Sequence, residues 1–125
     1  MAVNYYIKFP GIIGGSKDSV HLGWFEVDSW LVDFSGGGKA VMDRFRFWIS
    51  DGENPSELAE GVRSGRHLGD VTFDYTRSDG SLAARIEFKD AVLTSFTYGF
   101  ELNFASYRTI HFDPLMHEPA HGRAK

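Results

Sequence analysis

Five histidines are the residues of this 125-residue chain best suited to chemistry, because histidine binds metals and transfers protons near neutral pH. Three of them, His111, His117 and His121, fall near the C-terminus. His117 and His121 have the four-residue spacing of helical metal ligands, but Pro119 between them disfavours a helix. A metal-dependent enzyme or secreted effector that uses these three histidines is therefore only a minor alternative.

Two glycine-rich segments invite comparison with a phosphate-binding loop, and both depart from its pattern. Ser16 precedes Lys17 in the first, where the loop requires Lys before Ser or Thr, and Ala40 replaces the hydroxyl residue in the second. No Ser-His-Asp or paired-carboxylate spacing stands out, and the absence of cysteine excludes thiolate chemistry. We therefore expect no enzymatic activity, no metal and no cofactor.

Composition narrows the possible partners. The formal net charge is −4 and no run of Lys or Arg exceeds two residues, which argues against a nucleic-acid surface. No apolar stretch approaches the roughly 20 residues of a membrane span, so we expect no membrane insertion. The N-terminus lacks the apolar core and cleavage site of a signal peptide.

Alternation of apolar and polar residues predicts a mainly β protein. Asp79-Gly80 lies between two alternating runs and predicts a hairpin, and Asp90 is expected to form a tight bend. We expect a small β-barrel or sandwich of two packed antiparallel sheets with one helix, as a single domain over 1–113 and a flexible tail over 114–125. The predicted strands are Val3–Phe9, Leu22–Phe34, Val41–Ile49, Val71–Thr76, Leu82–Lys89, Ala91–Tyr98 and Phe100–Asp113.

One convincing helix is predicted from about Asn54 to Ser64. Asn54 can cap the first amides, Glu57 can complete a capping box, and Gly65 is a natural left-handed stop. Roughly three turns of helix are not stable alone, so its apolar face must pack on the β structure. That face is formed by Pro55, Leu58, Ala59 and Val62.

The second predicted strand is apolar on both faces, which in a small domain indicates contact with another subunit. Its candidate interface residues are Trp24, Phe25, Trp30 and Val32. An alternative remains open, in which Trp24, Trp30 and Trp48 line the pocket of a monomeric barrel that binds a small molecule.

Several motifs resemble, in order and spacing, the Hcp (haemolysin-coregulated protein) family of type VI secretion systems. The likeness covers about Ala2 to Asp113. The motifs are Ile7-Lys8, Gly15-Ser16-Lys17-Asp18, His21, the stretch Phe25–Trp30, Ser64-Gly65-Arg66-His67, the stretch Phe88–Gly99, Leu102-Asn103-Phe104 and Tyr107.

The resemblance implies a homohexameric ring with a wide central pore. Rings of that family stack into a tube that a contractile sheath drives out of the bacterial cell, and the pore carries effector proteins. The implied partners are further copies of the chain, sheath and spike components, and effectors. The implied location is the cytoplasm before assembly and the exterior afterwards.

Two departures from the family pattern affect stacking. The family's long glycine-rich excursion, which docks on the next ring, is shortened here, and an insertion before Phe100 is missing. We therefore expect strong contacts within a ring and weak contacts between rings. The shortened ring-stacking loop comprises Phe34, Ser35, Gly36, Gly37, Gly38 and Lys39.

Overall fold

The computed structural model describes residues 4–35, 41–97 and 99–112, with seven strands and one helix among them. Side chains at 33–35, 41, 43, 111 and 112 lie outside the description. In chain order the elements are β1 (Asn4–Lys8), β2 (Phe25–Ser35), β3 (Val41–Ile49), α1 (Ser56–Ser64), β4 (Gly69–Thr76), β5 (Leu82–Ser95), β6 (Phe100–Asn103) and β7 (Ser106–Phe112).

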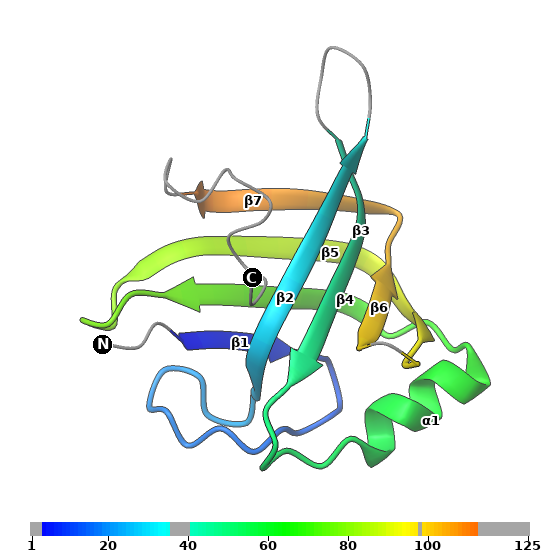
Figure 1. The fold of residues 1–125 in the computed structure, drawn as a ribbon, viewed down its shortest axis with the longest axis horizontal. Coiled ribbons are helices and arrows are strands. Elements are labelled where there is room, and N and C mark those ends of the chain that lie inside the picture. Colours follow the sequence, from blue (N-terminus) through cyan, green and yellow to red (C-terminus); the bar gives the residue numbers. More distant parts are fainter. Residues whose placement is uncertain (1–3, 36–40, 98, 113–125) are drawn as a thin grey trace.

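Six strands close into an antiparallel barrel. Their order is β4-β1-β2-β3-β6-β5, and the pairing of β4 with β5 closes the ring (Figure 1). Among the described strands, β7 pairs with β5 alone and lies outside the barrel. The mainly β fold with one helix, predicted from the sequence, is confirmed. Residues 113–125 lie outside the described residues, so the predicted tail is not tested.

β2 begins at Phe25, three residues later than expected, because Leu22 lies in a turn. Val27 pairs with Ile49 and Ser29 with Trp48, so β2 advances two residues where β3 advances one. This β-bulge shifts the alternation by one residue. The consequence is that Phe25, Val27, Trp30 and Val32 all point into the barrel, which explains the apolar residues on both apparent faces.

A second bulge lies in β3. Phe34 pairs with Met42 and Asp33 with Arg44, which leaves Asp43 as the extra residue. Met42 is therefore buried in the core rather than on the arginine-bearing face where simple alternation places it. In both strands a single inserted residue turns a period-2 pattern into an irregular one.

β5 continues through Asp90 instead of ending there. Asp90 adopts φ 54, a left-handed conformation that Asp tolerates better than most residues, and the strand changes partner at this point. Its first half pairs with β7 and its second half with β6, so the predicted strand Phe100–Asp113 is two strands. The Asp79-Gly80 hairpin is confirmed, with Gly80 at φ 90.

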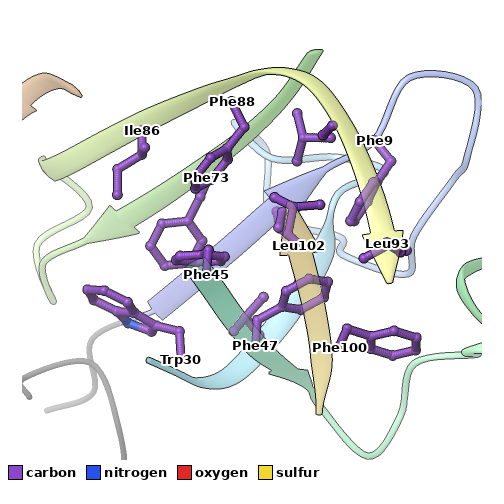
Figure 2. Packing of buried hydrophobic residues seen from close by; sticks show 14 of the residues in the cluster. Phe9, Trp30, Phe45, Phe47, Phe73, Ile86, Phe88, Leu93, Phe100 and Leu102 are labelled. Carbon is purple, nitrogen blue, oxygen red and sulfur yellow. The ribbon is translucent and has the colours of Figure 1, made fainter. Parts of the chain in front are cut away.

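Aromatic rings fill the barrel interior (Figure 2). The ring centre of Phe45 lies 4.9 Å from that of Phe73 and 5.0 Å from that of Phe88, and all three side chains are completely buried. Phe47 and Trp30 extend the cluster on either side of Phe45. This interior is packed, contrary to the open cavity that a ligand-binding barrel would need.

The helix α1 begins at Ser56, two residues later than predicted. Asn54 still accepts a hydrogen bond from the Ser56 amide at 3.0 Å, but Pro55 precedes the helix and is exposed, so its predicted place on the packing face is wrong. Leu58 is completely buried and Val62 packs against the core. Gly65 ends the helix at φ 66, as expected. In the described part of the chain, no helix is long and apolar enough to cross a membrane.

Candidate interaction surface

The segment between β1 and β2, residues 10–24, carries an unusual set of exposed side chains. Ile13, Val20 and Leu22 are 76%, 72% and 69% exposed. Among side chains whose exposure is described, Phe96 is the one other large apolar group in solvent, at 46%. Exposed aliphatic side chains that share one short loop can provide a protein contact, so we identify this segment, hereafter the apolar loop, as a candidate contact surface.

Backbone hydrogen bonds fold the apolar loop back on itself. Gly14 donates to the Gly23 carbonyl at 2.7 Å, and Ser16 donates to the Trp24 carbonyl at 2.9 Å. A Cβ at Gly14 would lie 2.5 Å from the carbonyl carbon of Trp24, so only glycine allows this approach. The loop is therefore preorganised although it contains no regular secondary structure.

Glu53, from the turn before α1, ties the apolar loop to the barrel. Its two carboxylate oxygens accept hydrogen bonds from the amides of Gly15 and Glu26, each at 2.8 Å. Charge-assisted hydrogen bonds of this kind are stronger than neutral ones. One side chain thus fixes both the loop and the start of β2.

A buried histidine makes a second tie. His21 is 3% exposed, and its Nδ1 lies 2.8 Å from Asp18 while its Nε2 lies 2.8 Å from Asp74 of β4. The ring stacks on Tyr6 with centres 4.0 Å apart, and Trp24 meets it edge-on at 4.7 Å. The hydrogen bond with His21 is the main reason that the pKa of Asp18 is lowered.

Asp74 is 1% exposed and has a second cationic neighbour. Its two oxygens accept from Nε and a terminal nitrogen of Arg85, at 2.6 and 2.7 Å. This hydrogen bonding raises the pKa of Arg85, and burial raises that of the Tyr6 hydroxyl. Asp18, His21, Asp74 and Arg85 form a continuous chain of polar contacts from the apolar loop to β5, hereafter the ionic bridge.

β7 supplies a second surface. Within the described residues it pairs only with β5, so its other edge presents backbone donors and acceptors. Arg108 on this strand pairs with Glu87 at 2.8 Å, and the Tyr107 hydroxyl accepts from the Met42 amide at 3.0 Å. The strand is thus anchored to the barrel on one side and open on the other.

The residues predicted to contact another subunit lie elsewhere. Phe25, Trp30 and Val32 are buried in the protein's own core, and Trp24 is partly buried beside His21. The prediction that these residues form an exposed interface is wrong for the first three, because the β2 bulge turns them inward. The missed signal was the presence of aliphatic residues in a segment whose glycines and polar residues mark it as a turn.

The three tryptophans do not line a common pocket. Trp30 packs inside the barrel against Phe45 and Phe73. Trp48 is not part of this core, and its indole lies against the backbone of Gly99. Trp24 lies at the apolar loop, where Lys8 approaches its ring at 5.9 Å. The packed interior and these separate positions argue against the small-molecule barrel.

The metal hypothesis gains no support from the described residues, which contain no group of three or more metal-binding side chains. His117 and His121 lie outside the described residues, as does the side chain of His111. Phe34 and Ser35 of the predicted stacking loop form the end of β2, and Gly36 to Lys39 lie outside the described residues.

Solved structures share this fold. Hcp1 from Salmonella typhimurium is 20% identical with a TM-score of 0.71, over 88% of this chain and 92% of that one. A type VI secretion system effector from Yersinia pestis is 22% identical with a TM-score of 0.66, over 87% and 98% of the two chains. Secreted protein Hcp3 from Pseudomonas aeruginosa is 15% identical with a TM-score of 0.59, over 88% and 91%. No family model and no curated protein matches the chain.

Proposed function

We propose that this chain is an Hcp-type tube protein of a type VI secretion system and that it assembles as a hexameric ring. One observation carries the proposal: an Hcp1 structure matches about nine-tenths of both chains, with a TM-score of 0.71. The ordered sequence motifs described above support the same family independently of the fold. A tube protein needs no catalytic site, so the proposed role is structural.

A closed ring requires two different, complementary surfaces on each protomer. The open edge of β7 is one candidate, because an unpaired strand edge can accept a strand from a neighbour. The apolar loop is the other candidate, because Ile13, Val20 and Leu22 would be buried by a partner. The two surfaces belong to different elements, as a heterologous contact needs.

The apolar loop provides a substantial part of such a contact. Burying an aliphatic side chain stabilises by about 1.5–3 kcal/mol at roughly 25 cal/mol per Å² of apolar area. Three such side chains correspond to roughly 200–350 Å², against about 800 Å² per partner in a standard interface. The apolar loop can therefore form the centre of a protein–protein contact, with polar residues around it.

The proposed ring stacks into a tube that carries effectors in its pore and meets sheath and spike components. We place the protein in the bacterial cytoplasm before assembly and outside the cell after the sheath has expelled the tube. The short segment from Phe34 to Lys39 supports weak contacts between rings, because three glycines offer no side-chain area and are costly to order.

Native mass spectrometry with negative-stain imaging tests this proposal. We expect a six-fold mass and ring-shaped particles at micromolar concentration. A strictly monomeric mass would exclude the ring and reopen the ligand-binding alternative. Imaging at several salt concentrations separates the two levels of assembly, because weak stacking should disappear before the ring does.

A further inference from the structure

The ionic bridge places its histidine between two acceptors. Both ring nitrogens of His21 lie 2.8 Å from carboxylate oxygens, and an ionised carboxylate can only accept hydrogen bonds. Both nitrogens can donate at once only in the doubly protonated, positively charged imidazolium. This geometry therefore suits a charged His21 better than a neutral one.

The groups that face His21 from every neighbouring element support a cation. Its own loop contributes Asp18, and β4 contributes Asp74, whose charge is shared with Arg85 of β5. β1 contributes the neutral ring of Tyr6. A buried charge is tolerated only when it is paired, and here two carboxylates face two cations.

We propose that the ionic bridge is a pH-sensitive clasp, which holds the apolar loop in its described position only while His21 carries both protons. A neutral imidazole has a single N–H. One ring nitrogen would then direct a lone pair at a carboxylate 2.8 Å away, which is repulsive. Asp18 and Asp74 then compete for the single N–H, and one of the two contacts is lost, although Asp74 keeps both hydrogen bonds from Arg85.

Loss of either contact acts on the segment from Asp18 to Leu22, which carries two of the three exposed aliphatic side chains. Loss of the Asp74 contact unties this segment from β4. Loss of the Asp18 contact weakens the turn, because the same Asp18 oxygen also accepts from the amides of Val20 and His21, at 3.2 Å each. The clasp therefore controls a candidate interaction surface, whether or not the protein forms rings.

The clasp also has an acid limit. The lowered pKa of Asp18 means that its contribution is present above the ordinary aspartate value of 3.8 and is lost as the pH falls below it. A protonated Asp18 would present an O–H donor to a ring nitrogen of His21 that is itself a donor. The closed position thus needs a charged Asp18 and a charged His21 together.

The test is NMR of the intact protein with labelled histidine, followed from acid to alkaline pH. We expect the His21 ring signals to be those of an imidazolium while the loop is closed. The amides of Val20 and His21 should then change together with the His21 ring signals as the pH rises, and should not follow the ring signals of exposed His67. A neutral His21 in the closed loop, or loop amides that ignore its titration, would overturn the proposal.

The variant Asp18→Asn provides a second and more specific test of the clasp. The amide oxygen can still accept from the two backbone amides and from an imidazolium, but it carries no charge to stabilise that cation, so the loop should open at a lower pH than in the unmodified protein. Asp51→Asn, an exposed aspartate in the turn before α1, is the matched control and should leave that pH unchanged. An unchanged opening pH in Asp18→Asn would refute the clasp.

Discussion

The barrel interior and the apolar loop are held together in opposite ways. The interior is a set of buried aromatic rings whose packing excludes water, with Phe45 at its centre. The loop leaves its aliphatic side chains in solvent and is fixed by glycine backbone contacts, Glu53 and the ionic bridge. Polar cross-links can therefore make a surface rigid while its apolar side chains stay available to a partner.

The largest expected effect lies in the interior. Phe45→Ala removes a completely buried ring that contacts Phe73 and Phe88, and we expect a loss of about 3–5 kcal/mol in the free energy of unfolding. Chemical denaturation measures it. Phe96→Ala is the control, because that ring is 46% exposed, and it should cost much less. Similar losses in the two variants would contradict the described core.

The second-largest loss of stability is expected from the buried face of α1. Leu58→Ala truncates a completely buried side chain on α1, so we expect a loss of about 2 kcal/mol or more. Glu60→Ala on the exposed side of the helix should be nearly neutral, since its ion pair with Arg63 lies in solvent. Equal effects at the two positions would mean that the helix packs through a different face.

A smaller loss of stability is expected from the cross-link that Glu53 makes between the apolar loop and β2. Glu53→Gln keeps the shape, but it removes the charge and replaces one of the two oxygens that accept from Gly15 and Glu26 with an NH2 group, so we expect a loss of about 1–2 kcal/mol in the free energy of unfolding. Hydrogen exchange should rise at Gly15 while the core amides stay protected at low denaturant. Glu57→Gln, exposed on α1, is the control. Unchanged exchange at Gly15 would show that the loop does not depend on Glu53.

The smallest effect on stability should come from the exposed surface. Leu22→Ser should change the free energy of unfolding by less than about 0.5 kcal/mol, because the side chain is 69% exposed. The same variant should weaken the proposed ring, measured by mass as the protein is diluted. Lys17→Ser, on the same loop, is a polar control. If the Leu22→Ser ring dissociated at the same concentration as the ring of the unmodified protein, Leu22 would not belong to the interface.

Local patterns in the sequence predicted the parts of the fold that depend on neighbouring residues. The Asp79-Gly80 hairpin and the helix stop at Gly65 are of this kind, because both need a left-handed glycine at one position. The bulges at Asp28 and Asp43 were missed, because an inserted residue looks like a broken pattern until the partner strand is known. The bulge at Asp28 accounts for the incorrect prediction of an interface on β2, and the bulge at Asp43 accounts for the burial of Met42.

The candidate site was harder to predict because its contacts are remote in sequence. Glu53 lies 38 residues from Gly15, and Asp74 lies 53 residues from His21. Neither spacing carries a periodic signal, and each residue alone suits an exposed turn or strand. The exposed aliphatic residues were visible, but only the folded loop shows that no other part of the described chain covers them.

The closed strand order also has a consequence for the rate of folding. β4 and β5 are joined by a short hairpin and can pair early, since their ends are adjacent in sequence. β1 completes the barrel by pairing with β4, and the Thr76 hydroxyl meets the Asn4 carbonyl across 72 residues of chain. Such distant contacts form only after a large loop-closure entropy is overcome. We therefore expect docking of β1 to be the late, rate-determining event, and substitutions there to slow refolding more than equivalent changes in the hairpin.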